Sequence, residues 1–235
     1  MSIDYSKLGL KVGIEIHQQL YTAGKLFCAC KPELFKEEPE ITFLRRLRPT
    51  QSELGQIDQA AFFEFQKGVK ILYEANRTSS CLVEMDEEPP HSLNPEAVDI
   101  ALTVALMVNA KPADEIHVMR KTVIDGSNTT GFQRTCVIAL NGEITIEEKK
   151  IPIQLIALEE DAARKTGEEH GGKTIHYRIG RLGIPLIEVT TGPVLYTSQE
   201  AEKTALAIGR ILRATGKVKR GIGTIRQDLN IDIKD

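Results

Sequence analysis

Apolar and polar residues alternate singly over much of the chain, which is typical of β-strands with one buried and one polar face. Short polar or glycine-containing breaks at 141–143, 167–172 and 181–183 indicate hairpin and meander connections, and therefore mainly antiparallel pairing. The alternation predicts strands over 10–20, 69–75, 80–85, 116–124, 135–140, 144–158, 174–179, 184–190 and 225–233.

Other segments have a helical pattern of apolar residues along one side. The predicted helices cover 57–67, 94–112 and 197–216. Asn94 can cap the second helix and Pro95 suits its first position, while Thr197 and Glu200 form the sequence of a capping box. The fold class is therefore α+β: one domain over 1–235, with a large, mainly antiparallel sheet and helices on one face.

The composition is that of an ordinary soluble globular protein, with 41% hydrophobic residues, 27% charged residues and a formal net charge of −3. This balance argues against a dedicated nucleic-acid clamp but leaves room for a local basic patch. The N-terminal segment is neither basic nor apolar enough for a signal peptide, and no apolar run approaches the ~20 residues of a membrane span. We therefore expect a cytoplasmic protein without membrane association.

The cysteines form no disulfide framework, which also favours a reducing compartment. Cys28 and Cys30, in "FCAC", resemble half of a zinc site, but zinc needs about four ligands and no second C-x-x-C follows. Folding could bring Cys81 and His91 to them. Two interpretations stay open: a zinc site that includes Cys28, Cys30 and Cys81, or thiols that are simply buried, which is the simpler one.

Two strands carry polar groups on the face opposite their apolar residues. Glu15 and His17 lie two residues apart, so a carboxylate and an imidazole could reach one cation. In the last strand, Arg226, Asp228 and Asn230 share a face in the same way. A solvent-exposed strand face explains either pattern taken alone.

Two further acids interrupt apolar sequence, where an unpaired carboxylate is costly. Glu188 lies within an otherwise apolar strand, and Glu159 and Glu160 follow the apolar run 151–158. Since neighbouring strand residues face opposite ways, only one of the latter two can reach a shared metal unless the strand bulges. We expect Glu160 to be the ligand and Glu159 its neighbour. Carboxylates with one imidazole fit Mg²⁺ holding a nucleotide phosphate better than zinc.

Basic and loop residues could bind that phosphate. Arg120 and Lys121 lie on a predicted strand, and the Gly/Ser/Asn/Thr loop that follows, with Ser127, offers backbone N–H groups and hydroxyls. Neither a Walker loop nor a Rossmann glycine pattern occurs in the sequence, so these basic groups are not part of a known nucleotide motif.

Several long motifs resemble one family in order from about residue 8 to the end of the chain. The chain looks like the catalytic domain of the B and E subunits of tRNA-dependent amidotransferases, and especially of the archaeal E subunit, which acts on Glu-tRNA(Gln). The motifs are "GLKVGIEIHQQL", "RRLRPTQSELGQID", "RKTVIDGSNTTGFQRT", "LEEDAARK", "RLGIPLIEVTT" and "RILRATGKVKRGIGTIRQDLNIDI". The resemblance implies a cradle fold shared with glutamine synthetase and the guanido kinases. It also implies that this cradle is truncated at its C-terminal side and lacks the tRNA-binding C-terminal domains.

The resemblance implies a ligase with two reactions. The γ-phosphoryl group of Mg–ATP first passes to the side-chain carboxylate of Glu esterified to tRNA(Gln). Ammonia from a partner amidase, the D subunit of the same complex, then displaces phosphate, within a heterotetramer of two D and two E subunits. Two alternatives remain open: a non-catalytic scaffold that docks the amidase, and an ATP-dependent amide ligase that does not need tRNA.

The same resemblance assigns roles to residues by motif. It implies His17, Glu160 and Glu188 as Mg²⁺ ligands. It implies a catalytic environment formed by Glu15, Glu159, Lys121, Arg226, Asp228 and Asn230. It places Thr224 on the late strand that lines the same cavity, so Arg120, Lys121, Ser127 and Thr224 are the expected contacts of ATP and its phosphates.

Overall fold

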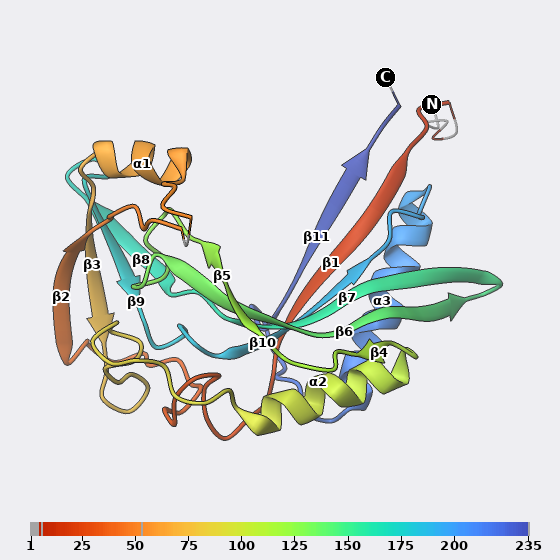
Figure 1. Cartoon of the computed structure of the whole chain (residues 1–235), viewed down its shortest axis with the longest axis horizontal. Coiled ribbons are helices and arrows are strands. Elements are labelled where there is room, and N and C mark those ends of the chain that lie inside the picture. The colour runs from red at the N-terminus through yellow and green to blue at the C-terminus, as the bar shows by residue number, and fades with distance from the viewer. Residues whose placement is uncertain (1–4, 6, 53, 235) are drawn as a thin grey trace.

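The chain forms two β-sheets joined by several loops, as the computed structural model in Figure 1 shows for residues 5, 7–52 and 54–234. The larger sheet has the strand order β11-β1-β10-β7-β6-β4, with β5 also paired to β6. Its strands are β1 (Lys11–Gln19), β4 (Lys111–Pro112), β5 (Val118–Thr122), β6 (Phe132–Ile146), β7 (Lys149–Glu160), β10 (Pro185–Thr191) and β11 (Ile225–Asp232). All of their pairings are antiparallel.

The smaller sheet has the order β2-β3-β9-β8. Its strands are β2 (Ile41–Arg46), β3 (Lys70–Ala75), β8 (Arg164–Glu169) and β9 (Thr174–Arg178). The pairing of β3 with β9 is parallel, and the other two pairings are antiparallel. A separate apolar cluster that includes Ile71, Tyr73 and Tyr177 supports this sheet.

Three helices accompany the sheets: α1 (Gln59–Gln66), α2 (Pro95–Met107) and α3 (Ser198–Ala214). The α2 and α3 helices contact strands of the larger sheet and cover one of its faces (Figure 1). As predicted, the Asn94 side chain accepts from the amides of Glu96 and Ala97, and the Thr197 side chain accepts from that of Glu200. By contrast, α1 has no buried residue.

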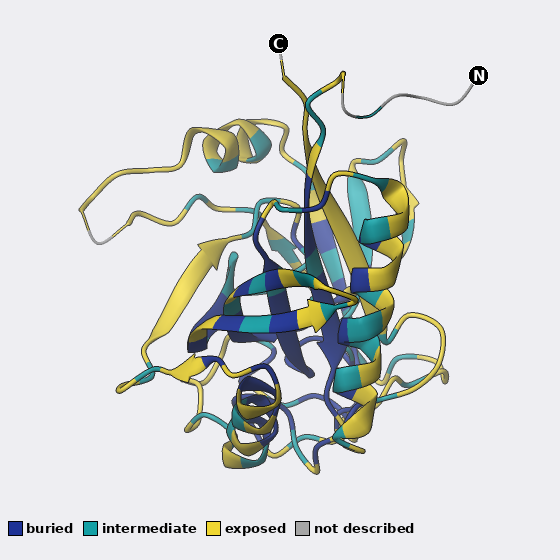
Figure 2. Ribbon diagram, turned by 90° about the vertical axis from the view of Figure 1, so that its right-hand side faces the viewer, coloured by how far each residue is buried: buried dark blue, intermediate teal, exposed yellow. Residues whose placement is uncertain are grey.

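The core lies between the larger sheet and its two helices. Alternation in β1 sends Val12, Ile14 and Ile16 into this core, where they join Ile208 and Leu212 of α3. Figure 2 shows the buried strands in the middle of the molecule, with helices that are exposed on their outer sides. The polar residues of the same strands therefore project from the opposite face of the sheet.

Most of the predicted elements are confirmed, and so is the α+β class with a large antiparallel sheet. The glutamine synthetase-like cradle stays a prediction. Among the described residues, no helix is long and apolar enough to cross a membrane. The sequence patterns missed β2, β4 and β8, since these strands are short or lack a clear alternation of apolar and polar residues.

Three predictions about strands and turns were wrong. Residues 80–85 form turns, because the Glu84 carboxylate accepts from the Cys81 amide and the amide of Met85 donates to the carbonyl of Cys81. Residues 141–143 continue β6, and the chain reverses only after Ile146. Residues 181–183 carry the chain from β9 in the smaller sheet to β10 in the larger one, so they are not a hairpin.

We predict that Gly142→Ala destabilises the fold. A Cβ atom at this position would lie 2.9 Å from both the Cβ of Ala110 and the carbonyl oxygen of Val108. Overpacking against a backbone atom should lower the free energy of unfolding by about 1–3 kcal/mol, measured by urea unfolding.

The matched control is Gly209→Ala, within α3, where an added Cβ has no atom within 4 Å. This substitution should raise stability by roughly 0.5–1 kcal/mol, since alanine favours a helix interior. Unchanged stability in Gly142→Ala would show that β6 does not pass under the end of α2.

Candidate functional site

The polar face of the larger sheet brings acidic residues from three strands together. His17 of β1 is paired directly with Glu188 of β10, and Glu188 with Ala157 of β7. Glu159 lies two residues beyond Ala157, so it projects from the same face. Glu15 reaches this face from β1 by the same alternation.

Side-chain distances confirm that these groups meet. The Nε2 atom of His17 lies 3.4 Å from Oε1 of Glu15, 3.3 Å from Oε2 of Glu159 and 3.8 Å from Oε2 of Glu188. Lys121 of β5 contacts the Glu159 carboxylate, and its Nζ lies 3.3 Å from Oε2 of Glu188. We call Glu15, His17, Lys121, Glu159 and Glu188 the acid cluster.

The acid cluster is closed on its sheet side and open on the other. The side chains of Glu159 and Glu188 are 1% and 6% exposed, whereas those of Glu15 and Lys121 are 29% and 49% exposed. Two hydroxyls that sequence reasoning missed hold the buried carboxylates: Thr135 donates to Glu159 at 3.1 Å and Thr190 to Glu188 at 3.0 Å. Thr190 could have been found from its position two residues after Glu188.

Close packing of these charges changes their pKa values. Burial alone would lower the pKa of His17, but its hydrogen bond to Glu159 and the charges of Glu159 and Glu188 raise it. Burial would raise the pKa of Glu159, but hydrogen bonds with His17, Glu188 and Lys121 lower it to about 2. Burial and the neighbouring Glu159 raise the pKa of Glu188. Of this carboxylate pair, Glu159 therefore keeps its negative charge to a lower pH than Glu188.

The donor set of the acid cluster fits a hard divalent cation. One carboxylate oxygen each from Glu15 and Glu188 and a ring nitrogen of His17 all lie within 4.8 Å of one another. The buried Nδ1 atom of His17 has no hydrogen-bond partner in the part of the chain that the structure describes. Carboxylate oxygens are the ligands that Mg²⁺ prefers, and Glu159 adds a further carboxylate beside this group.

Glu160 does not lie with His17 and Glu188, contrary to our expectation. Its carboxylate accepts from Nη1 of Arg134 at 3.1 Å and from the amide of Arg134, also at 3.1 Å. Regular pairing continues to the end of β7, where Glu160 is opposite Pro185, so alternation turns Glu160 to the other face. Glu159 takes the place in the acid cluster that we expected for Glu160.

The third acid of this run, Asp161, has its own partners. Its carboxylate accepts from Nε2 of Gln19 at 2.6 Å and lies 3.6 Å from Nε of Arg181. The three adjacent acids therefore do not share one ligand. Each is held by a different set of neighbours, which offsets the cost of their burial.

The last strand extends the polar face beside the acid cluster. In its pairing with β1, Arg226 lies opposite His17, Asp228 opposite Glu15 and Asn230 opposite Gly13. All three are exposed. The positive charge of Arg226 acts to lower the pKa of His17. The structure brings this predicted group beside the acid cluster, while the roles of its members stay predictions.

The other expected phosphate contacts lie elsewhere. Arg120 alternates with Lys121 on β5, and its guanidinium stacks over the ring of Phe132 at 5.0 Å. The amide of Ser127 donates to the side chain of Asp125. The hydroxyl of Thr224 donates to backbone carbonyls within its own loop. Of the four, the structure brings only Lys121 into the acid cluster.

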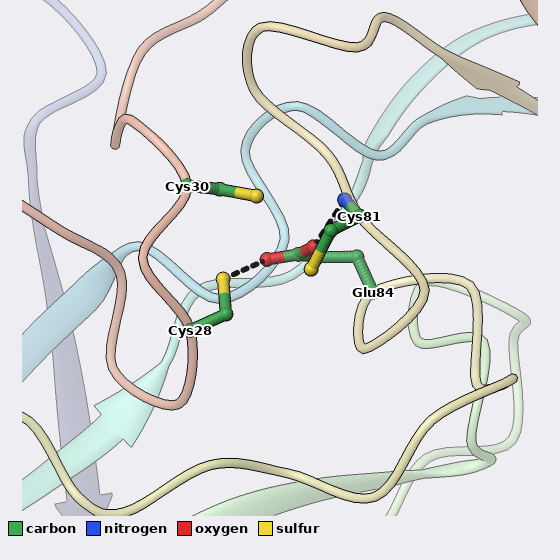
Figure 3. Close-up of side chains that lie close together, drawn as sticks. All are labelled: Cys28, Cys30, Cys81 and Glu84. Carbon is green, nitrogen blue, oxygen red and sulfur yellow. Dashed lines mark hydrogen bonds between the residues drawn. The ribbon is translucent and has the colours of Figure 1, made fainter.

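The three cysteines that we considered for zinc lie together, as Figure 3 shows. Glu84, which sequence reasoning missed, joins them. Its only sequence signal is its position three residues after Cys81. His91 lies outside this group, and its ring contacts Glu88 at 2.7 Å.

Comparisons with known proteins agree on one family. A family model described as the GatB/GatE catalytic domain matches residues 10–235. The chain is 59% identical over 232 residues to the E subunit of the glutamyl-tRNA(Gln) amidotransferase of Aeropyrum pernix. It is 60% identical, also over 232 residues, to proteins of the same name from Saccharolobus solfataricus and Sulfolobus acidocaldarius. Each match covers 99% of this chain and 36% of the relative, so the chain spans about a third of these proteins' length.

We predict that Glu160→Gln lowers the stability of the fold without weakening metal binding, whereas Glu188→Gln weakens metal binding. Glu160→Gln should lower the free energy of unfolding by about 3 kcal/mol, because the buried Arg134 loses its counter-charge. This variant should bind Mn²⁺, a spectroscopic substitute for Mg²⁺, as tightly as the unaltered chain.

Glu188→Gln should weaken Mn²⁺ binding at least about tenfold, because a charged oxygen ligand is removed. Electron paramagnetic resonance measures free Mn²⁺, and urea unfolding measures stability. Loss of Mn²⁺ binding in a folded Glu160→Gln protein would return Glu160 to the ligand set.

Proposed function

The chain belongs to the GatB/GatE catalytic domain family, and from this premise we propose that it amidates the glutamate carried by tRNA(Gln). The names of its archaeal relatives support the substrate. The acid cluster is the observation that carries the reaction type. A scaffold has no need for three carboxylates and an imidazole that converge on an open face of a sheet.

Amidation of a carboxylate needs activation first, since its leaving group would otherwise be oxide. In the proposed first step, an oxygen of the substrate carboxylate attacks the γ-phosphorus of ATP, the bond to the β-phosphate oxygen breaks, and ADP leaves. In the second step, ammonia attacks the acyl carbon and the C–O bond to phosphate breaks. The products are the amide on tRNA(Gln) and inorganic phosphate.

The acid cluster has the groups that phosphoryl transfer requires. Glu15, His17, Glu159 and Glu188 would hold Mg²⁺, which when bound neutralises charge on the transferred phosphoryl group. Lys121 places its ammonium group at the same opening, beside Glu159 and Glu188, where its positive charge can balance negative charge on phosphate oxygens. Such a reaction depends on positioning and cations more than on covalent participation of the protein.

The remaining polar groups of this face would act on the substrates. Arg226 and Asn230 are exposed donors beside the acid cluster, within the reach of an entering aminoacyl group. Attack by ammonia releases a proton, and Asp228, opposite Glu15, is an exposed carboxylate suited to accept it. We propose that a partner amidase, the D subunit of such an enzyme, supplies the ammonia, in an assembly of two D and two E subunits.

The test is release of ADP from Mg–ATP by the chain, with Glu-tRNA(Gln) present or absent. We expect release that depends on the aminoacyl-tRNA. Glu188→Gln and Lys121→Met should each lower the rate by about 10²-fold or more, since each removes a charge aimed at the phosphoryl group.

A matched control is Glu143→Gln, which breaks an exposed ion pair with Lys150 on the β6–β7 hairpin and should leave the rate unchanged. Release that is equally fast without tRNA would instead indicate an ATP-dependent amide ligase for a small substrate. A folded chain that releases no ADP with Glu-tRNA(Gln) would contradict catalysis by these residues alone and favour a scaffold.

A further inference from the structure

The segment from α3 to the start of β11 carries an unbalanced positive charge. Residues 203–227 contain seven Lys or Arg and no Asp or Glu, although the whole chain has a formal net charge of −3. The seven are Lys203, Arg210, Arg213, Lys217, Lys219, Arg220 and Arg226. Within this segment, residues 217–224 belong to the connection from α3 to β11 (Figure 1), and we call them the basic loop. Positive charge at this density favours a polyanion as partner.

A pocket of about 330 Å³ lies at the basic loop. Its lining includes Arg213, Lys219 and Arg220, together with Gln18, Gly221 and Thr224, and no lining residue is acidic. Arg213 and Arg220 are exposed. Neither of these two side chains has an ion-pair or hydrogen-bond partner among the residues that the structure describes.

The fold accounts for only part of this charge. The helix dipole favours a cation in the last turn of α3, which explains Arg213 taken alone. Lys217 lies 3.6 Å from Glu96 of α2, and Lys219 donates to a backbone carbonyl of the loop before β2. Arg220 lies beyond the helix and has no counter-charge of this kind. The pocket therefore presents guanidinium groups that no partner within the described chain neutralises.

The backbone of the basic loop is fixed, but its donors are unused. The Nε2 atom of Gln18 donates to the carbonyls of Lys219 at 3.0 Å and of Thr224 at 2.9 Å, and the Thr224 hydroxyl donates to the carbonyl of Gly221 at 2.8 Å. By contrast, the amides of residues 220–223 donate to no other described residue. Because carbonyls are bonded and N–H groups are left over, the loop suits an anion better than a cation.

Two glycines leave this backbone open to a ligand. Gly221 and Gly223 have φ values of 119° and 83°, a conformation that side chains disfavour. A Cβ atom added at either position would have no atom within 4 Å. Since Ile222 between them is also fully exposed, nothing in the described chain covers the tip of the loop.

From these features we propose that the basic loop and Arg213 bind phosphate groups in the backbone of an RNA strand. Guanidinium groups bind phosphate oxygens through paired hydrogen bonds, and backbone N–H groups add further donors. Contacts of this kind fix where the RNA lies and do not read its sequence. That this RNA is the aminoacyl-tRNA substrate rests on the proposed function.

The position of the basic loop favours RNA over ATP. At the start of β11, Ile225 is opposite Gln18 and Arg226 is opposite His17. Thr224 is two residues from Arg226, about 7 Å along a strand, so the loop lies near the acid cluster. Alternation, however, turns Gln18 and Ile225 toward the helix-covered face, away from His17. A polymer can cross the end of the sheet and occupy both places, whereas ATP at the acid cluster keeps its phosphates on the opposite face.

The test measures binding of fluorescently labelled tRNA(Gln), without its amino acid, by anisotropy at several salt concentrations. Affinity of the unaltered chain should fall steeply as salt rises, because bound phosphates release counterions. Arg213→Gln and Arg220→Gln should each weaken binding by about 3–10-fold and reduce the salt slope by about 1. Neither arginine has a partner within the described chain, so both variants should keep the fold, which circular dichroism checks.

The matched control is Lys203→Gln. It removes a positive charge from the same helix, about 15 Å from Arg213 along the axis, where Lys203 pairs with Glu147. Its affinity for tRNA and its salt slope should equal those of the unaltered chain. Calorimetry with Mg–ATP should likewise give the same affinity for the unaltered chain and for both arginine variants.

Three results would overturn the proposal. The first is unchanged tRNA affinity in the Arg213→Gln, Arg220→Gln double variant. The second is equal competition by polyglutamate, which would indicate a docking surface for an acidic protein. The third is loss of Mg–ATP binding with normal tRNA binding, which would make the pocket a nucleotide site.

The two proposals of function and of RNA binding can fail separately. A chain that binds tRNA through the basic loop but releases no ADP contradicts the proposed function alone. A chain that releases ADP with Glu-tRNA(Gln), and whose double variant binds tRNA normally, contradicts the role of the basic loop alone.

Discussion

Antiparallel pairing of β1 with β10, and of β10 with β7, in one fixed register determines where the charges of this protein meet. His17 is opposite Glu188, and from β7 Glu159 projects from the same face two residues beyond the partner of Glu188. A slip of one residue in β7 would exchange Glu159 for Glu160 on that face. The apolar residues of the same strands fix the register, because a slip would also expose them to water.

In the acid cluster, the carboxylates outnumber the positively charged groups that the same cluster supplies. Its carboxylates share one imidazole and one ammonium group, and Glu159 and Glu188 are almost fully buried. An arrangement of this kind contributes little to stability, since burial of acids is costly even when they are paired. Its opening to solvent beside Lys121 and the late strand instead fits a surface that receives a cation and phosphate groups.

The end of β7 connects the acid cluster to the group formed by Cys28, Cys30, Cys81 and Glu84. Glu159 turns toward the acid cluster and Glu160 toward Arg134, on the side where Gly183 also lies close to Glu84 and Lys25. Gly183 has a φ of 83°, so a residue with a side chain would be strained there, although its Cβ atom would make only ordinary contacts with Glu84 and Glu160. The junction of the two sheets and the candidate active site are thus built on adjacent residues.

The sequence by itself determined the α+β class, most strands, the two capped helices, and the faces shared by Glu15 with His17 and by Arg226 with Asp228. These features depend on periodicity and on local hydrogen bonds, which neighbouring residues control. Only the tertiary structure decided that Glu159 and not Glu160 joins His17, that 141–143 continues a strand, and that Glu84 meets the cysteines. Strand pairing and packing between residues far apart in the chain make those choices. A single sequence records which residues can alternate, but not which neighbour each strand will accept.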